Sequence, residues 1–227
     1  MAEVTAIVVA RKGSVRVPQK NRLMLNGVPL FLRKIQQLQN AKQVDRIVFG
    51  SDDEYMLEIA EKNGADTIRR PDFFCDERVA SANDMIGNMM DSIETDIVVW
   101  AHCTNPLISS ATYDKAIEIF FSASELQYDS LLSVVELREH LWQERGHEFC
   151  PLNYNPYATR HTPARELPPY YMQDGGIFIQ PYKQMKANRY FFGKRPYLFM
   201  VPKDEFLDVN DYRDYLLAKA IVEEEDR

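Results

Sequence analysis

The sequence predicts a three-layer α/β fold built around a mostly parallel sheet. Short apolar runs alternate along the chain with longer segments whose apolar residues recur at helical spacing. The runs at residues 4–10 and 97–101 are rich in β-branched residues and carry no charge, which is typical of strands buried on both faces of a parallel sheet. With 227 residues, the chain is long enough for one sizeable α/β domain, and we predict a single domain over residues 1–227.

A strand, a loop, a helix and a second strand open the chain. After the strand at residues 4–10 and its loop, Asn26-Gly27 is a strong turn signal, and Pro29 suits the first turn of a helix that we expect to end near Asn40. The apolar run at residues 46–50 follows as the second strand. Since the two strands are expected to be parallel, the crossover between them should be right-handed.

Capping residues mark the next helix. Ser51-Asp52-Asp53 can cap a helix over residues 54–63, and Gly64 is suited to end it. The same alternation then continues to the end of the chain. We expect further helices at residues 84–93, 109–122 and 211–224, and further strands at residues 65–70, 97–101, 131–137 and 197–201.

One long segment does not fit this alternation. Residues 138–169 are polar, rich in Pro, Tyr and His, and have no steady period of two or 3.6 residues. A stretch of this length without regular structure in a compact domain is usually functional or part of an interface. We therefore predict that residues 138–169 form an excursion from the domain.

Composition restricts the classes of function. The net charge of −7 and the isoelectric point near 5.2 argue against a general nucleic-acid-binding protein. Cys75, Cys103 and Cys150 are widely spaced and form no zinc-type pattern, so we interpret them as reduced thiols. The N-terminal apolar run follows no basic segment and is too short for a signal peptide or a membrane span. We therefore expect a cytoplasmic protein without nucleic-acid or membrane partners.

A basic segment contrasts with this acidic background. Residues 10–22, ARKGSVRVPQKNR, contain five cationic side chains and begin where the first strand ends. Ligands of open α/β sheets bind at the C-terminal ends of strands, and a loop with Gly13, Ser14 and several cations suits phosphates. A solvated basic loop is the alternative interpretation. Neither the Walker A pattern nor the G-x-G-x-x-G pattern is present, which excludes both of those nucleotide loops.

The pattern A-R-x-G-S-x-R-x-P-x-K-N at residues 10–21 resembles the signature loop of the acylneuraminate cytidylyltransferases, the CMP-sialic acid synthetases. Enzymes of that family join CTP to a 2-keto-3-deoxy sugar acid and release pyrophosphate with the help of Mg²⁺. The resemblance implies an enzyme with Rossmann-like nucleotide-binding topology that transfers CMP to the anomeric hydroxyl of a sialic-acid-like (nonulosonic) acid. The alternatives are another sugar-nucleotide transferase of the same fold and a non-catalytic relative that binds CTP. The identity of the sugar acid stays open.

The basic loop corresponds to the phosphate end of the site in that family. The resemblance implies that Arg11 and Lys20 are catalytic and contact the phosphates of the nucleotide, and that Ser14 binds non-bridging oxygens. Asn21 would help to fix the cytidine and the loop.

Further segments resemble nucleotide-binding parts of the family. Arg69-Arg70-Pro71 is similar to an L-R-P motif whose arginine lies near the nucleotide, which implies that Arg70 binds the nucleotide. Residues 76–83, DERVASAN, resemble a D-x-x-S segment, and Ser81 is close to the position of a serine that contacts the base. A helix cap is an equally good interpretation of Ser81. Asp52 lies in a segment that reaches the nucleotide end of the sheet in the family, and a plain N-cap is its alternative role.

The sequence HCTNPL at residues 102–107 resembles the family's L-Q-P-T-S-P-L-R. Thr104 matches, whereas His102 departs at the point where the relatives have a glutamine that binds the sugar acid. An imidazole still offers a donor and an acceptor, and it titrates near neutral pH. The resemblance implies that His102 and Thr104 bind the substrate, and His102 is our candidate for a general base. A hydrogen-bonded structural histidine is the alternative.

More substrate contacts are implied near the end of the chain. Arg165 matches the arginine of the R-x-x-L-P motif, a clamp for the sugar carboxylate, and its planar fork suits that task. Phe191 and Phe192 align with phenylalanines that line the acyl side of the sugar pocket, although core aromatics are an equal alternative. Residues 173–179 resemble the family's N-G-A-I-Y-I strand, which implies a strand there. Asp174 replaces the asparagine of that motif, and its role stays open. In the family, the region of residues 138–169 is an arm that packs on a second subunit and carries sugar-binding groups, which implies a homodimer.

A metal site is implied just before the last helix. The family has D-x-D there, two carboxylates that hold Mg²⁺ on the triphosphate, and this chain has Asp208 and Asn210. The resemblance implies that Asp208 is catalytic and that Asp208 and Asn210 are the metal ligands. Asparagine coordinates through its carbonyl oxygen but lacks a negative charge, so we expect weaker Mg²⁺ binding. Asp211 would replace that charge only if it turned inward, and we interpret Asp211 as a helix N-cap.

Overall fold

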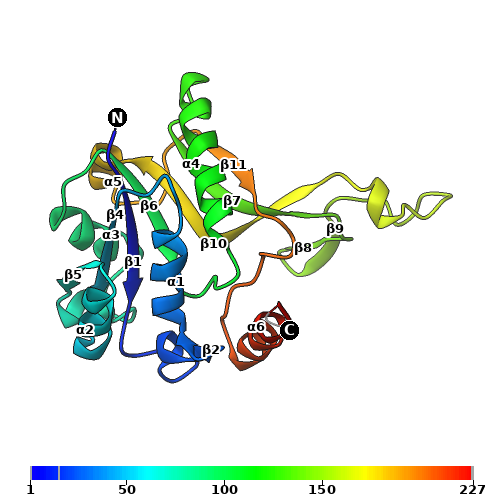
Figure 1. Ribbon diagram of the computed structural model, residues 1–227. Helices are drawn as coiled ribbons and strands as arrows, with labels where there is room; N and C mark the ends of the chain where they lie inside the picture. The colour runs from blue at the N-terminus through cyan, green and yellow to red at the C-terminus, as the bar shows by residue number, and fades with distance from the viewer. Residues whose placement is uncertain (1, 15, 226–227) are drawn as a thin grey trace.

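Seven strands form one continuous sheet at the centre of the molecule (Figure 1). The structure is a computed structural model that describes residues 2–14 and 16–225, so Val15 of the basic loop lies outside the described residues. Every neighbouring pair of strands is parallel except the two pairs that involve β10, which is antiparallel to both β6 and β7. The predicted mostly parallel α/β fold is therefore confirmed. The strand order is β11 (Pro196–Met200), β7 (Ser130–Leu137), β10 (Tyr170–Pro181), β6 (Ile97–His102), β1 (Val4–Ala10), β4 (Arg46–Ser51) and β5 (Asp66–Arg69).

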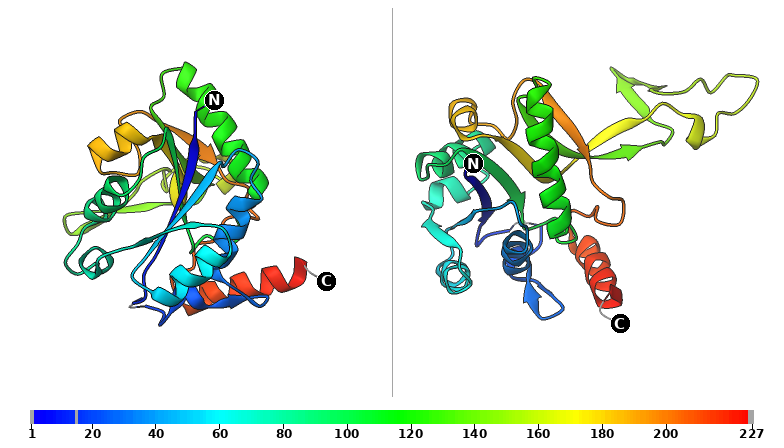
Figure 2. Two further views of the ribbon diagram at one scale, coloured as in Figure 1. Left: turned by 60° about the vertical axis from the view of Figure 1, so that its left-hand side comes forward. Right: turned by 45° about the horizontal axis from the view of Figure 1, so that its top comes forward.

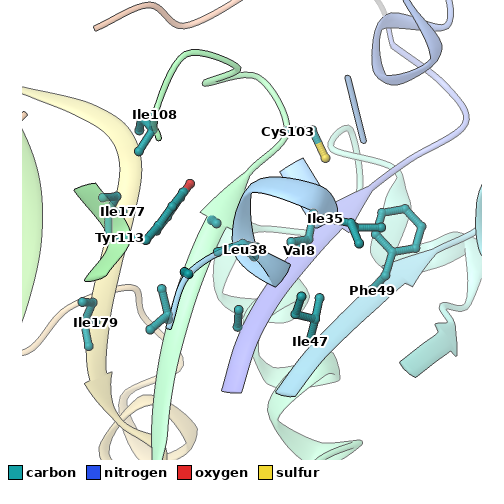
Figure 3. Close-up of a cluster of buried hydrophobic side chains, with 14 of the residues drawn as sticks. Val8, Ile35, Leu38, Ile47, Phe49, Cys103, Ile108, Tyr113, Ile177 and Ile179 are labelled. Atoms are coloured by element: carbon teal, nitrogen blue, oxygen red, sulfur yellow. The ribbon is translucent and has the colours of Figure 1, made fainter. Parts of the chain in front are cut away.

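Helices cover both faces of the sheet and complete the three layers (Figure 2). Alternate residues of each buried strand point to opposite faces, so Val8 joins one core cluster and Ile7 the other. The first cluster includes α1 (Leu30–Gln39), α2 (Glu54–Lys62) and α4 (Ser110–Glu125), and Figure 3 shows part of it, with Tyr113 of α4 between Ile177 and the helix α1. The second cluster includes α3 (Ala82–Asp91) and α5 (Tyr182–Asn188).

A third, smaller core lies at the edge of the sheet where the strands end. The last helix, α6 (Tyr212–Glu225), packs there through Tyr215, Ala218 and Val222 against Leu25. Leu25 belongs to a two-stranded ribbon of β2 (Met24–Leu25) and β3 (Val28–Pro29). Asn26 and Gly27 join the two strands with φ values of 46° and 76°, as the turn signal predicted.

Side-chain caps fix where the helices begin. Asp53 accepts hydrogen bonds from the backbone N–H groups of Tyr55 and Met56 at the start of α2. Ser81 forms a capping box with Asp84, so α3 begins at Ala82, earlier than the predicted residue 84.

The predicted excursion contains more regular structure than its sequence pattern indicated. A hairpin of β8 (Trp142–Arg145) and β9 (Glu148–Pro151) lies in it, and β10 begins earlier than predicted, at Tyr170. Figures 1 and 2 show that this part of the chain extends away from the sheet and its helices as a long arm. The helix α5 was not predicted either. No helix within residues 2–14 and 16–225 is both long and apolar enough to cross a membrane.

Candidate active site

A cavity of about 460 Å³ opens at the C-terminal ends of β1 and β6. This edge of the sheet is where an α/β fold binds its ligands, because several loops converge there. The basic loop, Arg70, the segment of residues 74–85, the loop after β6 and the segment of residues 208–210 all contribute to its lining. The sequence-predicted residues that line it are Arg11, Ser14, Lys20, Asn21, Arg70, Ser81, His102, Thr104, Asp208 and Asn210.

The basic loop places its cations on the cavity by folding back over β1. The amide of Asn21, which is buried, donates to the backbone carbonyl of Arg11 at 3.1 Å and so ties the two ends of the loop together. Asn21 therefore has the loop-fixing contact that the resemblance implied. The backbone N–H of Lys12 donates to the carboxylate of Asp52 at 2.7 Å, so Asp52 holds the loop, whereas Asp53 is the helix cap.

Two of the loop's cations are engaged by other parts of the protein. Arg11 forms an ion pair with Glu77 at 2.6 Å and donates to the carbonyl of Cys75. The ammonium of Lys20 donates to the carbonyl of Val209 at 2.8 Å. Burial lowers the pKa of Lys20, although the carboxylate of Asp208 opposes the shift. The cavity thus gathers positive charge in a partly desolvated place, where it attracts anions strongly.

Arg70 crosses the floor of the cavity as a buried cation with only 2% of its surface exposed. It donates to the carbonyl of Phe74 at 2.6 Å, while its Nε has no partner within the described structure. Burial lowers the pKa of Arg70. Its path depends on Gly50 of β4, because a Cβ there would lie 2.9 Å from the Cδ of Arg70 and 2.6 Å from the Sδ of Met89.

Ser81 lies on the cavity in its role as a cap. Its hydroxyl donates to the carboxylate of Asp84 at 2.7 Å and accepts from the backbone N–H of the same residue at 3.2 Å. The alternative interpretation of Ser81, a helix cap, is therefore confirmed. A ligand in the cavity would contact the hydroxyl oxygen of Ser81, which its hydrogen bonds to Asp84 of α3 keep in a fixed position.

His102 has a partner on each ring nitrogen. Nε2 accepts from the indole N–H of Trp100 at 3.3 Å, so the proton lies on Nδ1, which donates to the carbonyl of Gly175 at 2.5 Å. Burial lowers the pKa of His102, which keeps the ring neutral. Because its basic nitrogen faces the indole N–H, this arrangement favours the structural interpretation of His102 over a general base.

Phe191 and Phe192 do not line the cavity. Phe191 packs against Trp100, His102 and Phe178, with its ring centroid 4.7 Å from that of Phe178. Phe192 lies beside the same core cluster. Both phenylalanines therefore support the wall behind His102, as the core-aromatic alternative describes.

The segment of residues 208–210 is held at the cavity by hydrogen bonds to the backbone of Val209. The N–H of Val209 donates to the carbonyl of Thr104 at 2.7 Å, which joins this segment to the loop after β6. The side-chain amide of Asn210 donates to the Oδ2 of Asp208 at 2.6 Å, and the Oδ1 of Asp208 is buried without a partner in the described structure. Asp211 accepts from the backbone N–H groups of Arg213 and Asp214, which confirms that it caps α6.

This pair of side chains suits a hard divalent cation. An unpartnered, buried carboxylate oxygen needs a cation or a donor. Asn210 now faces Asp208 with its amide nitrogen, so it would have to rotate that amide to present its carbonyl oxygen to the same ion. Mg²⁺ needs few protein ligands, because it keeps several waters and takes oxygens from phosphates. Among residues 2–14 and 16–225 no three His, Cys, Asp or Glu side chains gather in a way that could hold a metal ion, so Asp208 and Asn210 would need such outside ligands.

Arg165 lies apart from the cavity. It is exposed, in a short 3₁₀ turn of the arm over Ala164–Glu166. Other residues that line the cavity were not predicted as site residues: Val9, Ala10, Arg16, Phe74, Cys75, Glu77, Ala80, Ala82, Met85, Asn105 and Gly175. Arg16 carried a signal in the sequence, as one of the cations of the basic loop.

Comparison with known proteins identifies similar sequences and structures. The family model described as cytidylyltransferase matches residues 5–187. The chain is 27% identical to the N-acylneuraminate cytidylyltransferase of Escherichia coli O18:K1:H7 over 99% of its length, and spans 53% of that relative. It is 23% identical to the pseudaminic acid cytidylyltransferase of Campylobacter jejuni subsp. jejuni serotype O:2, and this match covers 95% of the chain and 94% of the relative. A solved structure of CMP:2-keto-3-deoxy-manno-octonic acid synthetase complexed with CTP has the same fold, with a TM-score of 0.67 and 14% sequence identity. The match covers 99% of this chain and 100% of that one.

Proposed function

The chain belongs to the cytidylyltransferase family, and we propose that it transfers CMP from CTP to the anomeric hydroxyl of a sialic-acid-like 2-keto-3-deoxy sugar acid, with release of pyrophosphate. The observation that carries this proposal is the cavity at the ends of β1 and β6. In a chain of net charge −7, that cavity is lined by Arg11, Arg16, Lys20 and Arg70 together with the carboxylates of Glu77 and Asp208. A triphosphate beside a carboxylic acid is the kind of ligand pair that such a charge distribution suits.

The cations would act by position and charge. The reaction attacks the α-phosphorus with a sugar hydroxyl, and most of the catalysis of phosphoryl transfer comes from alignment and from neutralising the phosphate oxygens. Arg11 and Lys20 extend from the loop above the cavity, and Ser14 adds a hydroxyl donor. Arg11 would exchange Glu77 for a phosphate oxygen, whereas Lys20 can keep Val209 and still offer its other N–H donors.

Asp208 and Asn210 would hold Mg²⁺ at the cavity. When bound, the metal would supply Lewis-acid polarisation and lower the pKa of a coordinated hydroxyl. Asp208 contributes one carboxylate oxygen that is already desolvated and unpartnered in the described structure. Asn210 contributes a neutral oxygen, so the site has less negative charge than a pair of aspartates would give.

The sugar end of the cavity is proposed to lie near Thr104 and the main chain beside His102. The relatives named above include cytidylyltransferases of N-acylneuraminate and of pseudaminic acid, which supports a nine-carbon keto-sugar acid as the substrate class. The ring of His102 would contact the sugar through its surface and offer it no hydrogen bond, since both ring nitrogens already have partners. We propose that Arg165 reaches the sugar carboxylate from the arm of a second subunit in a homodimer.

Pyrophosphate release tests this function. The protein is incubated with CTP, Mg²⁺ and one acid at a time from a panel of nine-carbon and eight-carbon keto-sugar acids, with Asp208→Asn as the inactive control. Release with one acid, lost in Asp208→Asn, supports the proposal and identifies the substrate.

A second candidate, a non-catalytic CTP-binding protein, is favoured by one observation. Asn210 stands where a second carboxylate would strengthen the metal site, and its side-chain amide donates a hydrogen bond to Asp208. The variant Asn210→Asp distinguishes the two candidates. Activity that appears only in this variant, together with CTP binding by the unmodified protein, would support the second candidate and contradict the first.

A further inference from the structure

The proposed metal ligands lie on the connector between β11 and α6. Figure 1 shows this segment, residues 201–211, running from the edge of the sheet to the last helix. Because β7 and β10 lie between β11 and β6, the connector covers about 14 Å on its way to the cavity, where Asp208 and Asn210 contribute to the lining. The position of these two side chains therefore depends on how the connector is attached to the rest of the molecule.

Glu205 attaches the connector to the protein shortly before Asp208. Its Oε2 accepts from the backbone N–H of Ser109 at 2.9 Å, and its Oε1 accepts from the hydroxyl of Ser109 at 2.8 Å. Ser109 is the N-cap of α4, and its hydroxyl also accepts from the backbone N–H of Thr112 at 3.2 Å. Hydrogen bonds to a charged acceptor are stronger than neutral ones, and the positive end of a helix dipole stabilises a carboxylate. The attachment through Glu205 is therefore a firm one.

A second attachment follows directly after Asp208. Val209 has no exposed surface, and its backbone N–H donates to the carbonyl of Thr104 at 2.7 Å. Thr104 and Ser109 belong to the same stretch of chain, the loop that leads from β6 into α4. Asp208 thus lies between two attachments of the connector to a single loop.

The loop between β6 and α4 is itself held by the helix α1. The side chains of Arg33 and Gln37 donate to the carbonyl of Pro106 at 3.0 and 2.7 Å. The ammonium of Lys34, which is buried, donates to the carbonyl of Asn105 at 2.9 Å. A connector that is attached to this loop at two points is therefore joined to the helices and the sheet of the core.

We propose that Glu205 is a positioning residue for the transfer reaction, because it fixes Asp208 on the cavity by attaching the connector to the first turn of α4. Glu205 does not itself line the cavity, so it acts through the connector and not by contact with a substrate. Without it, Asp208 would be held from the side of Val209 alone. This inference rests on the proposed function, since it assigns the effect of Glu205 to a ligand of Mg²⁺.

Variants of the attachment test this role. Glu205→Ala removes it, and Glu205→Asp keeps the charge but withdraws the carboxylate by shortening the side chain. Glu205→Gln keeps an accepting oxygen at the original reach, so it can retain the hydrogen bond from the backbone N–H of Ser109. Ser109→Ala removes the cap of α4 but leaves that backbone N–H in place. Asp204→Ala is the matched control, because Asp204 is an exposed carboxylate of the same connector.

The measurements separate metal binding from folding. For each protein we would determine the kcat, the KM for CTP, the Mg²⁺ concentration that gives the half-maximal rate, and the thermal midpoint. Two further readouts need no turnover. The first is the affinity for Mn²⁺ in the presence of CTP, measured by electron paramagnetic resonance. The second is the hydrogen-exchange rate of the Val209 amide, because its bond to Thr104 reports whether the connector keeps its place.

We expect Glu205→Ala to raise the half-maximal Mg²⁺ concentration and to weaken Mn²⁺ binding by about tenfold to a hundredfold, as is usual when a group that orients a metal ligand is removed. The Val209 amide should exchange faster in this variant, and Glu205→Asp should show the same changes to a smaller extent. The KM for CTP at saturating Mg²⁺ should change less, because the basic loop is unaltered.

The other variants should behave differently. Glu205→Gln should recover most of the loss of metal affinity. Ser109→Ala should lower the thermal midpoint, because it removes a helix cap, with a smaller effect on the Mg²⁺ requirement. Asp204→Ala should match the unmodified protein in every readout.

Two results would overturn the inference. One is a lower thermal midpoint in Glu205→Ala with an unchanged Mg²⁺ requirement, which would mean that Glu205 serves stability alone. The other is an equal rise of the Mg²⁺ requirement in Ser109→Ala, which would mean that the cap of α4 accounts for the effect. Glu205→Asp decides in the same way if Glu205→Ala does not fold.

The failure of the proposed function would be recognised separately. It has failed if the unmodified protein releases no pyrophosphate with any acid of the panel. The exchange rate of the Val209 amide then decides the positioning role by itself. Faster exchange in Glu205→Ala than in Ser109→Ala supports that role, and an unchanged rate contradicts it.

Discussion

Three cations of the cavity, Arg11, Lys20 and Arg70, donate to partners within the protein that a phosphate would have to replace or share. The ion pair of Arg11 with Glu77 is the clearest case, because Glu77 is 60% exposed in its side chain and occupies a guanidinium that would otherwise face the cavity. Arg11 holds the pKa of the Glu77 carboxyl below its usual range, so this carboxyl is ionised at neutral pH. Glu77 therefore competes with an incoming triphosphate for Arg11.

The variant Glu77→Gln should bind CTP more tightly. An exposed ion pair of this kind contributes roughly 0.2–1 kcal/mol, so its removal should lower the KM for CTP by up to about fivefold. Steady-state kinetics with varied CTP measures the change, and Glu118→Gln, which removes an exposed ion pair with Lys115 on α4, is the control. An unchanged or higher KM in Glu77→Gln would show that Glu77 does not compete with the phosphates.

Lys20 should make CTP binding sensitive to alkaline pH. Its pKa is lowered by burial, and Arg16 and Arg11 lower it further, so the free protein loses this positive charge at a lower pH than an ordinary lysine does. The protonated form binds phosphate, which means that the affinity for CTP falls as the pH rises through the lowered pKa. Calorimetry from about pH 7 to about pH 10 should show this decline, and Lys20→Arg should retain affinity to higher pH. Equal declines in both proteins would contradict this role of Lys20.

At the scale of elements, one buried carboxylate joins the basic loop to the helix α2. Asp53 caps α2 and also forms an ion pair with Arg22 at 2.5 Å, while only 3% of its own surface is exposed. Arg22 lies at the end of the 3₁₀ turn Lys20–Arg22, which begins after Gln19 with a φ of 52°. The position of Lys20 thus depends on contacts made by the first turn of a helix.

The variant Asp53→Ala should lose about 2–4 kcal/mol of the free energy of unfolding. It removes a helix cap, which contributes about 1 kcal/mol, and leaves the guanidinium of Arg22 without its partly buried partner. Denaturant unfolding measures the loss. Asp66→Ala, which breaks an ion pair between exposed side chains with Arg46, should lose less than about 1 kcal/mol. Similar losses in the two variants would contradict the special position of Asp53.

Local signals explain which elements the sequence predicted. The buried strands and the capped helices were found because apolar runs and caps such as Asp53 act within a few residues of the chain. The helix α5 was missed because it is short and is held by tertiary contacts, such as the hydrogen bonds of Tyr182 to the carbonyls of Met90 and Ile93. The hairpin β8–β9 was missed because its alternation is weak and most of its residues are exposed.

The site was predictable where it lies in a contiguous motif. Arg11, Ser14 and Lys20 belong to one loop, and a resemblance between sequences locates such a loop directly. Glu77 and Asn105 lie in segments that the resemblance matched, but neither residue was assigned a role, and their places on the cavity follow from the way distant segments meet in space. The lack of a free basic nitrogen on His102 follows from Trp100 and Gly175, and Gly175 lies on a strand far along the chain.

At the scale of the whole molecule, the arm carries side chains that a lone subunit leaves exposed. Trp142, Phe149 and Tyr157 are large, and 55%, 70% and 91% of their surfaces are exposed. Figure 2 shows the arm extending away from the rest of the molecule in a second direction of view. Exposed aromatic groups on a projecting segment are typical of an interface. We therefore expect the protein to form a homodimer through this arm, with Phe149→Glu shifting it towards monomer in sedimentation measurements.

Mixed dimers test whether Arg165 works in the neighbouring subunit. Arg165→Ala and Asp208→Ala should each be inactive as pure proteins, because one lacks the proposed carboxylate clamp and the other a proposed metal ligand. If the arm of one subunit completes the cavity of the other, a mixed dimer has one cavity with both defects and one cavity with neither. Equal amounts of the two variants, unfolded together and refolded, should then regain roughly a quarter of the unmodified activity, since half of the dimers are mixed and each has one intact site. No regain from a sample that sedimentation shows to be dimeric would mean that Arg165 does not act across the interface. The sugar carboxylate would then have to be bound by groups within one subunit, and Arg16 is a cation on the cavity that has no assigned role.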